Sequence, residues 1–355
     1  MYITVGNKGK MELGIYTRYS ELGASSRLRC YRYAGTLRNC GFDVRMHPLM
    51  RDDTLKALYG GRGRTVKLAR DLARRMFALP RAEKNLWIEY ELLPGVACGV
   101  EKLYLRHRRY VLSFDDAVYL NYRGKKLLDG KFERLAAGAV GVMAANDLLV
   151  EHFSRFNANT VKIPTAVDIE SLRPGAEKFP RFTAVWIGTP VTFKAHLAPF
   201  APMLNELARE LDFDLLLIGA PTAAQTLFPG ARVAAWSEDA ERELLPKCHA
   251  GIMTLPANDA FAAGKSAYKL LQYLAAGLPS VASPVGENRV VVRPGATGFL
   301  AASPAEWKQA FQALVTDEKL RAELAAAARN EAEKYSVRRY APVIEKFFEK
   351  SFFGA

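Results

Sequence analysis

Strand-like apolar runs alternate with helix-like stretches along this chain, and the alternation starts twice. Met11–Thr17 reads as a strand, followed by a small-residue loop, a helix from Arg27 to about Asn39 and a new strand from Phe42. Phe182–Ile187 opens the same pattern again. This alternation is typical of doubly wound parallel sheets with helices on both faces. A chain of 355 residues also exceeds the size of one growing core. The sequence therefore predicts two α/β domains, joined by a Pro- and Gly-rich linker within residues 165–181.

Several classes of protein are disfavoured by composition. No run of 18 or more apolar residues occurs, and residues 1–10 lack the apolar stretch of a signal peptide. The chain has four scattered cysteines and five histidines without ligand spacing. Asp212 and Asp214 form a D-x-D pattern, which can bind a metal ion when it follows a strand. Here the pattern precedes a strand, so we expect it to cap the start of that strand instead. These features predict a cytoplasmic protein with reduced thiols and no metal site.

The excess of positive over negative charge lies entirely in the first part of the chain. Residues 1–165 contain 29 Lys and Arg against 16 Asp and Glu, which accounts for the whole net charge of +13, whereas residues 166–355 contain 21 of each. Such a field attracts nucleic acid, an anionic membrane or a phosphorylated acceptor. Arg62–Lys84 reads as a basic amphipathic helix with an apolar face at Leu68, Leu72, Met76 and Leu79, and Arg106–Arg109 extends the basic patch. We expect it to dock on an anionic membrane surface; the alternative is an ordinary solvated helix face.

An anion site is predicted in the second half, where Gly264, Lys265 and Ser266 precede a helix. The helix has an apolar face at Leu270, Leu271, Leu274 and Ala275, stops at Gly277, and is followed by a strand at 280–282 and a turn at Gly286. The N–H groups and dipole of a helix N-terminus favour a phosphate. Asp259 stands where a P-loop has its first Gly, so a P-loop NTPase is excluded.

The same segment resembles the nucleotide-sugar-binding core of GT-B glycosyltransferases of the family-4-like type, the glycosyl transferases group 1. Residues 272–283, QYLAAGLPSVAS, are similar to the family's EAMAxGxPVVAS pattern. Three further stretches match family motifs in the same order: 162–174 the linker, 185–194 the diphosphate loop, and 295–300 a glycine-rich turn. The resemblance implies two Rossmann-like α/β/α domains facing a central cleft, over residues 1–166 with a returning helix at 337–355, and over 167–336.

The resemblance also implies a set of site residues. Lys194 and Lys265 are expected to stabilise the charge of the leaving diphosphate without a metal, and Asp115 or Asp116 to accept or position the proton of the acceptor hydroxyl. The alternative for this Asp pair is a helix cap or loop pair. The predicted donor-binding residues are Gly23, Arg27, Gly188, Thr192, Gly264, Ser266, Ala267, Gln272, Gly286, Glu287 and Asn288.

The chain departs from the family pattern at three places. Gly264 and Gln272 stand where the family has two Glu, and Thr189 stands where it has the Arg of the diphosphate loop. The Asp115–Asp116 pair stands in the setting where many relatives have a His. Gln272 can still hydrogen-bond ribose hydroxyls, because an amide donates and accepts.

The function implied is retaining transfer of a sugar from a UDP- or GDP-linked donor to a glycan or lipid-linked acceptor, in cell-surface polysaccharide or lipopolysaccharide biosynthesis. No cofactor and no nucleic-acid partner are expected, and the location is the cytoplasm or the inner face of the cytoplasmic membrane. Two alternatives remain open. One is a nucleotide-sugar 2-epimerase of the same fold. The other is a non-catalytic basic protein, binding membrane or nucleic acid, on a degenerate transferase scaffold.

Overall fold

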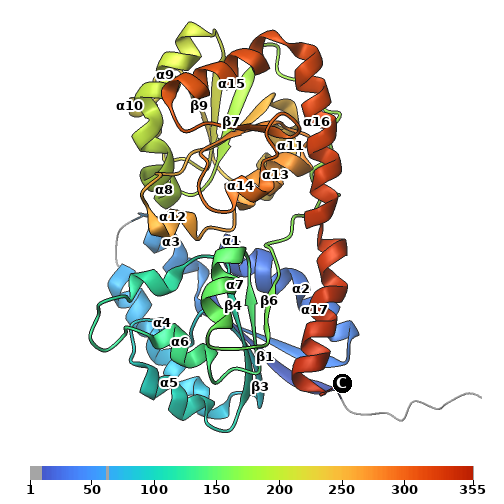
Figure 1. The fold of residues 1–355 in the computed structure, drawn as a ribbon. Coiled ribbons are helices and arrows are strands. Elements are labelled where there is room, and N and C mark those ends of the chain that lie inside the picture. The colour runs from blue at the N-terminus through green and yellow to red at the C-terminus, as the bar shows by residue number, and fades with distance from the viewer. Residues whose placement is uncertain (1–9, 61–63, 355) are drawn as a thin grey trace, which may run out of the picture. The chain divides into compact units, whose positions relative to one another are not determined.

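A computed structural model describes residues 10–60 and 64–354 of the chain. It divides into two compact units. Unit 1 comprises residues 1–164 and 341–355, and unit 2 comprises residues 165–340. Each unit is a parallel six-stranded sheet between two layers of helices (Figure 1). The predicted α/β class with two Rossmann-like domains is confirmed.

The sheet of unit 1 has the strand order β2-β1-β3-β4-β5-β6, and every neighbouring pair is parallel. Its strands are β1 (Met11–Tyr19), β2 (Phe42–Met50), β3 (Asn85–Glu89), β4 (Arg109–Phe114), β5 (Gly141–Ala144) and β6 (Thr160–Lys162). The central strands are almost wholly buried. This is expected where helices cover both faces of a parallel sheet.

Helices cover both faces of that sheet. The described helices of unit 1 are α1 (Ala24–Ser26), η1 (Arg27–Tyr31), α2 (Arg32–Asn39), α3 (Asp52–Gly60), α4 (Arg64–Ala78), η2 (Leu79–Arg81), α5 (Cys98–Leu105), η3 (Val118–Asn121), α6 (Lys131–Ala136) and α7 (Asp147–Ser154). The first three run on without a break, with a π-helical turn at η1. In Figure 1, α4, α5 and α6 lie on one side of the strands and α2 on the other.

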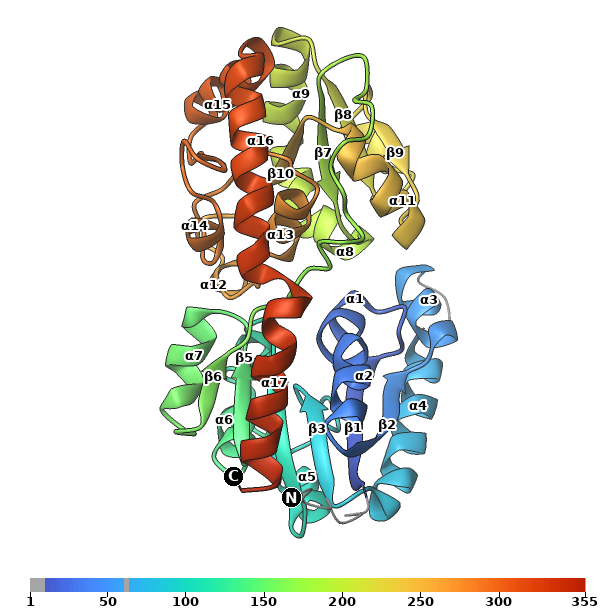
Figure 2. The ribbon, with the colours of Figure 1, turned by 90° about the vertical axis from the view of Figure 1, so that its right-hand side faces the viewer.

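The last helix of the chain, α17 (Val337–Phe352), completes the core of unit 1. Its Phe348 ring contacts Trp87 of β3 and Phe42 of β2, at centroid distances of 5.1 and 6.1 Å. Arg109 donates to the carbonyls of Ser351 and Phe352 at 2.6 and 2.7 Å. A cation at a helix C-terminus satisfies orphan carbonyls and opposes the dipole. Figure 2 shows α17 over the same face as α2.

The sheet of unit 2 has the order β12-β11-β10-β7-β8-β9, again all parallel. Its strands are β7 (Thr183–Ile187), β8 (Asp214–Ile218), β9 (Arg232–Ala234), β10 (Ala250–Met253), β11 (Ser280–Ala282) and β12 (Gly298–Leu300). Alternate residues of β7 belong to two different hydrophobic clusters, because successive side chains point to opposite faces. Asp214 is the first residue of β8, as its position in the D-x-D pattern predicts.

The helices of unit 2 cover these two clusters. They are α8 (Pro190–Thr192), η4 (Phe193–Leu197), η5 (Ala198–Phe200), α9 (Ala201–Glu210), α10 (Ala224–Leu227), α11 (Glu238–Leu244), η6 (Leu245–Lys247), α12 (Ala260–Ala263), α13 (Tyr268–Ala275), α14 (Asn288–Val291), α15 (Pro304–Thr316), α16 (Glu318–Ala332) and η7 (Glu333–Tyr335). Helix α13 packs in one cluster with Val185 and Ile187, and α9 and α15 pack in the other with Trp186.

Three local expectations are corrected by the structure. The first helix begins at Ala24 rather than Arg27, so Ser25 and Ser26 lie in its first turn. Helical backbone in unit 2 begins at Pro190, so Lys194 lies within a π-helical turn and not in a loop. Strand β3 and helix α5 had no counterpart in the sequence analysis.

No helix within the described residues has the length and apolar character that crossing a membrane requires.

The basic helix is the largest departure from expectation. Its Arg62 lies outside the described residues. The side chains that α4 and η2 bury are Asp71, Arg75 and Leu79, whereas Leu68 is exposed. Of the expected apolar face, Leu79 is buried, Leu72 and Met76 are half-buried and Leu68 is exposed, so the face is confirmed only in part. Arg75 donates to the carbonyls of His47, Thr17 and Leu92 at 2.6, 3.0 and 3.3 Å.

Two neighbouring cations of the expected basic patch also donate to main-chain carbonyls. Arg74 donates to the carbonyls of Pro48 and Leu49, both at 2.9 Å. Arg108 donates to the carbonyls of Leu79 and Glu83, both at 3.1 Å. Burial lowers the pKa of Arg75 to about 10, so this side chain remains charged at neutral pH. Part of the predicted basic face thus holds unit 1 together.

We predict that Phe348→Ala lowers the free energy of unfolding of unit 1 by about 3–5 kcal/mol, because it leaves a cavity between Trp87 and Phe42. Chemical denaturation followed by tryptophan fluorescence measures the change. Val343→Ala in the same helix is the matched control, because Val343 is 43% exposed and its truncation should cost less than about 0.5 kcal/mol. Equal effects of the two variants would contradict the packing of α17.

We also predict that Arg75→Ala destabilises the protein by about 3 kcal/mol or more, since each buried carbonyl left without a donor costs about 1–3 kcal/mol. Lys67→Ala is the control from the same helix, because the Lys67 side chain is 38% exposed. Urea denaturation at neutral pH compares the two. A loss of stability as small for Arg75→Ala as for Lys67→Ala would show that the three carbonyls do not need this side chain.

Candidate functional site

Each sheet has one place where its strand order reverses. In unit 1, β1 lies between β2 and β3, so the chain leaves β1 in one direction and later resumes on its other side. In unit 2, β7 lies between β8 and β10 in the same way. Ligands of open α/β sheets bind outside the carboxyl ends of the strands at such switch points. The residues that follow β1, β3 and β4, and those that follow β7 and β10, are therefore the candidate sites.

In unit 1, two carboxylates meet at the switch point. Glu89 ends β3 and Asp115 follows β4, and both side chains are buried. The hydroxyl of Ser25 in α1 lies 2.8 Å from Glu89 Oε1 and 2.7 Å from Asp115 Oδ2. Glu89 Oε2 accepts from the Ser26 hydroxyl at 2.5 Å and from the N–H of Arg18 at 2.8 Å. The end of β3 is thereby joined to the helix that follows β1.

Tyr90 directly follows Glu89 in the chain, and its side chain reaches Asp115 from a strained backbone. Its φ is 62°, which is unusual for a residue with a side chain, and its hydroxyl donates to Asp115. Backbone strain of this kind is found at functional sites. Burial and the charge of Asp115 raise the pKa of Tyr90, so the phenol stays protonated at neutral pH. Arg18 lies over the Tyr90 ring, 5.6 Å from its centroid.

The other predicted residues of unit 1 surround this cluster. Gly23 is the N-cap of α1, and a Cβ there would lie 2.2 Å from Tyr19 Cβ, so only glycine fits. Arg27 donates to the carbonyls of Glu21 and Leu22 at 3.1 and 3.3 Å, which supports the loop after β1. Asp116 is half-buried beside Asp115. The structure thus brings Gly23, Asp115 and Asp116 to one end of the sheet, and their roles toward a substrate stay predictions.

Sequence reasoning missed Ser25, Glu89 and Tyr90. The signal for β3 is the apolar run Leu86–Ile88, which ends in Glu-Tyr-Glu. An acidic residue directly after a buried strand of a parallel sheet lies at the sheet edge where ligands bind. Ser25 and Glu89 are 64 residues apart, so only the β1–β3 pairing shows that they meet.

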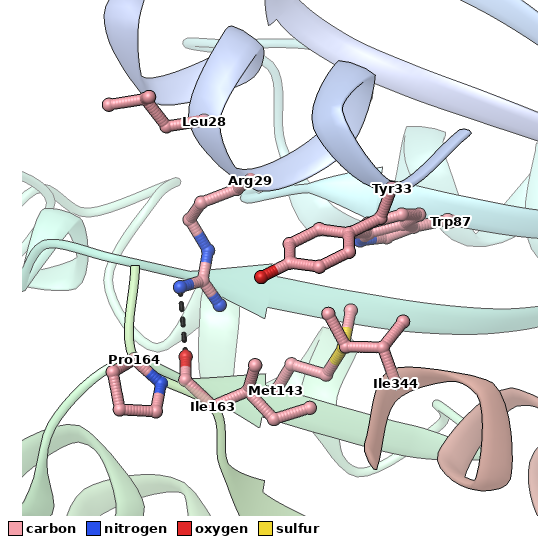
Figure 3. Close-up of a pocket in the computed structure, with 8 residues that line it drawn as sticks. All are labelled: Leu28, Arg29, Tyr33, Trp87, Met143, Ile163, Pro164 and Ile344. Atoms are coloured by element: carbon pink, nitrogen blue, oxygen red, sulfur yellow. Dashed lines mark hydrogen bonds between the residues drawn. The ribbon is translucent and has the colours of Figure 1, made fainter. Parts of the chain in front are cut away.

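A small cavity of unit 1 is too small for a substrate. It is lined by Leu28, Arg29, Tyr33, Trp87, Met143, Ile163, Pro164 and Ile344 and has a volume of about 10 Å³, room for one water molecule at most (Figure 3). Arg29 donates to the Ser113 hydroxyl and to the Ile163 carbonyl, both at 3.0 Å. These two hydrogen bonds join β4 to the segment after β6.

In unit 2, Tyr273 ties the switch point together. Its hydroxyl accepts from the N–H of Ile187 at 3.3 Å and donates to the carbonyl of Ile252 at 3.1 Å. Helix α13 is thereby fixed against the ends of both β7 and β10. From the same helix, Lys269 lies 5.5 Å from the centroid of the Trp186 ring. Lys269 is a cation of the site region that sequence reasoning did not select.

The turn after β7 is held by hydrogen bonds between two threonines. Thr189 and Thr192 form a reciprocal capping box, in which Thr189 N–H donates to Thr192 Oγ1 at 2.9 Å and Thr192 N–H donates to Thr189 Oγ1 at 3.3 Å. A Cβ at Gly188 would lie 2.7 Å from Thr192 Oγ1, so the predicted residues Gly188 and Thr192 are in contact range. Thr189, in place of the family's Arg, serves as the helix cap. Lys194 follows in η4 and is exposed.

The start of α13 has the features of an anion site. Ala267 is its N-cap and has φ 52°, and it is one of three described non-glycine residues with positive φ, with Tyr90 and Asp212. Within the part of the chain that the structure describes, the N–H groups of Ser266 and Ala267 donate no hydrogen bond. Lys265 stands beside them, with its ammonium 5.1 Å from the centroid of the Phe261 ring. Strained backbone, unpaired N–H groups and a cation are thus combined in three consecutive residues.

The glycine turn after β11 packs against this segment. Gly286 has φ 51°, and a Cβ there would lie 2.1 Å from the carbonyl oxygen of Ala263, next to Gly264. Gly264 and Gly286 are therefore brought together. Asn288 is buried and donates to the Ser283 carbonyl at 2.9 Å, and its Oδ1 has no hydrogen-bond partner within the described chain. Glu287 and Gln272 are buried as well, at 7% and 5% exposed.

No three His, Cys, Asp or Glu side chains in residues 10–60 and 64–354 gather closely enough to hold a metal ion. Cys30, Cys40, Cys98 and Cys248 are all free, and three of them are buried.

Comparison with known proteins matches the second unit in sequence and the whole chain in fold. Residues 181–317 match the family model described as glycosyl transferases group 1. No curated protein matches the sequence. The matched segment includes both the turn after β7 and the start of α13.

Solved structures resemble the whole chain at low identity. HepE of Anabaena, solved in complex with UDP and glucose, is 13% identical with a TM-score of 0.66, covering 96% of this chain and 100% of its own. Sucrose-phosphate synthase of Thermosynechococcus elongatus is 11% identical with a TM-score of 0.68, covering 98% and 100%. TarM of S. aureus is 12% identical with a TM-score of 0.59, and 79% of this chain covers 59% of TarM. Taken with the family match, these likenesses identify a protein of GT-B fold whose second unit matches the glycosyl transferases group 1 family over residues 181–317.

Proposed function

We propose that the protein is a retaining glycosyltransferase that moves a sugar from a UDP- or GDP-linked donor to a glycan or lipid-linked acceptor, in cell-surface polysaccharide or lipopolysaccharide biosynthesis. The observation that carries this proposal is the family match over residues 181–317, because that segment contains the predicted anion site at the start of α13. The likeness to HepE, which is solved with UDP and with UDP-glucose, supports a nucleotide-sugar donor.

In this proposal the donor diphosphate binds at the switch point of unit 2. Breaking the bond between sugar and phosphate leaves negative charge on the nucleoside diphosphate. The N–H groups of Ser266 and Ala267 and the ammonium of Lys265 would stabilise that charge, and Lys194 would add a second cation. Gln272, Glu287 and Asn288 are proposed contacts of the ribose and the donor sugar. No metal or cofactor is part of the proposal.

The donor site is tested by thermal shift with UDP, GDP and their sugar conjugates. A nucleotide at 100 times its dissociation constant should stabilise the protein by about 2.7 kcal/mol. We predict that Lys265→Ala weakens binding at least about tenfold, because a hydrogen bond to a charged group contributes about 1.5–3 kcal/mol. Lys247→Ala is the matched control, since Lys247 is a partly exposed lysine of unit 2 paired with Glu243. Equal affinity in all three proteins would place the nucleotide elsewhere.

The acceptor is proposed to be presented at an anionic membrane surface, on the cytoplasmic side. The support is α4, where Val66 and Phe77 are 76% and 79% exposed on a helix that also carries several cations. Exposed apolar side chains beside Lys and Arg are typical of helices that lie in a membrane interface. Arg70 pairs with Asp53 at 3.1 Å, so the apolar residues are the sharper probes.

We predict that Phe77→Ser reduces co-sedimentation with vesicles containing anionic lipid, whereas Leu127→Ser does not. Leu127 is the control because it is 71% exposed in the same unit but lies outside α4. Binding of the wild type should also weaken with salt, because the Debye length falls from about 10 Å at 0.1 M to about 3 Å at 1 M. Equal binding to neutral vesicles would exclude an electrostatic membrane site.

One observation favours the non-catalytic alternative: Gly264 and Thr189 stand where the family has an acid and a cation, and Thr189 is occupied as a helix cap. Product analysis with a panel of donors and acceptors separates the functions. A glycosylated acceptor with a retained anomeric configuration supports the proposal. Interconversion of the donor sugar at C2 without transfer would identify an epimerase. Nucleotide binding with neither reaction would identify a binding protein.

A further inference from the structure

In the carboxylate cluster of unit 1, hydrogen-bond acceptors outnumber the protons available to join them. Ser25 Oγ lies within hydrogen-bond distance of three oxygens: Glu89 Oε1 at 2.8 Å, Asp115 Oδ2 at 2.7 Å and Tyr90 OH at 3.1 Å. A serine hydroxyl has one proton to donate. If both carboxyls were ionised, that proton would serve one of them, and the other would face the serine oxygen with no proton between the two atoms.

The neighbouring donors decide which carboxyl is ionised. Glu89 Oε2 already accepts from Ser26 Oγ–H and from the N–H of Arg18. Among the described residues, the other donor to Asp115 is Tyr90, through Oδ1. Glu89 is therefore the better-supplied acceptor, and a proton on Asp115 Oδ2 completes one directed chain: Tyr90 donates to Asp115, Asp115 to Ser25, and Ser25 to Glu89.

We propose that Asp115 is a neutral carboxylic acid at physiological pH, that Ser25 links it to an ionised Glu89, and that this chain is the proton-handling group of the acceptor site. The proposal adds Ser25 and Glu89 to the residues expected to take part. It also changes the role of Asp115, which positions Ser25 and holds a proton rather than accepting one.

The charges around the pair support one retained proton. Burial, then the charge of Asp116, raises the pKa of Asp115, and Arg29 opposes this shift. Burial, then the charge of Asp115, raises the pKa of Glu89. Two buried carboxyls that share a hydrogen-bonding partner do not both ionise readily. Arg18, a second cation near the cluster, lies over the Tyr90 ring and pairs with Glu91 at 3.6 Å.

The chemical step depends on the proposed function for the identity of the substrate. Ser25 is the partly exposed member of the chain, whereas Glu89 and Asp115 are buried. An acceptor hydroxyl bound to Ser25 gives its proton to Ser25 Oγ while the proton of Ser25 passes to Glu89. The acceptor oxygen forms its bond to the anomeric carbon, and the electron pair of the breaking bond goes to the diphosphate. Glu89 afterwards releases the proton to solvent.

The proton is tested without any substrate. Infrared spectroscopy of the wild-type protein at pH 7 should show the carbonyl band of a protonated carboxylic acid, and Asp115→Asn should lose it. Asp71→Asn is the matched control, because Asp71 is also buried but its hydrogen bonds from Thr54, Arg51 and Arg70 lower its pKa. Absence of the band from the wild type, or its loss in Asp71→Asn, would overturn the proposal.

Stability gives a second readout. Asp115→Asn should keep or raise the urea midpoint at pH 7, because its amide N–H replaces the acid O–H toward Ser25 and does not titrate. Glu89→Gln should lower the midpoint in either orientation of the amide. Its NH₂ group faces either the donors Ser26 and Arg18 or the Ser25 hydroxyl, whose proton then has no acceptor on residue 89. Since the pKa of Asp115 is raised on folding, the wild type should lose stability relative to Asp115→Asn as the pH rises above about 4. The reverse order of the two variants would assign the proton to Glu89 and overturn the proposal.

The catalytic role is tested separately. Ser25→Ala should lower kcat on the order of 10²-fold or more with little change in KM, as expected for loss of general acid–base catalysis. Ser20→Ala is the control at the end of β1, since Ser20 Oγ has no hydrogen-bond partner among the described residues. Unchanged kcat in Ser25→Ala would overturn the relay. If the wild type transfers no sugar, the proposed function fails, while infrared spectroscopy still decides where the proton is.

Discussion

The placement of the first strand inside each sheet is the constraint on which both candidate sites depend. A parallel strand needs a crossover to reach its neighbour, and the direction of crossing reverses at β1 and again at β7. The connections on the two sides of these strands diverge, so the backbone at their carboxyl ends is not covered by the next crossover. The strained residues Tyr90 and Ala267 both lie in segments that border these openings. Topology thus selects the position, and the local sequence supplies the chemistry.

One switch point presents acidic groups and the other presents N–H groups and lysines. The net charge of each unit does not predict this difference. Unit 1 accounts for the positive charge of the chain, yet its switch point presents carboxyl groups. The cations are used elsewhere: Arg75, Arg108 and Arg109 hold main-chain carbonyls that the strands and helices leave unpaired. Unit 2 is close to neutral in sequence, yet its switch point presents N–H groups and lysines. These two environments are the ones that the proposed acceptor hydroxyl and donor diphosphate require.

The second unit could be predicted from sequence more completely than the first. The apolar spacing of α13, its stop at Gly277 and the strand β11 are local signals, and all three are observed. The error at α4 has a physical origin, because a helix pattern assumes that apolar side chains face inward, whereas α4 buries Asp71 and Arg75. The contact of Ser25 with Glu89 depends on the register of β1 against β3, which no local pattern specifies. The donor-site roles of Lys194 and Lys265 remain predictions from the resemblance.

Helix α17 has a consequence for how the protein is made. Residues 341–355 belong to the first unit, and the rings of Phe347, Phe348 and Phe352 fill the face of its sheet that carries Trp87. During translation, the first 164 residues leave the ribosome long before these rings exist. The nascent first unit therefore lacks the α17 side chains on that sheet face until residues 341–352 are released, while the second unit has already gained its described strands. Domains that are continuous in sequence fold in the order of synthesis; here the amino-terminal unit is the last to be completed, and its dependence on chaperones should be the greater.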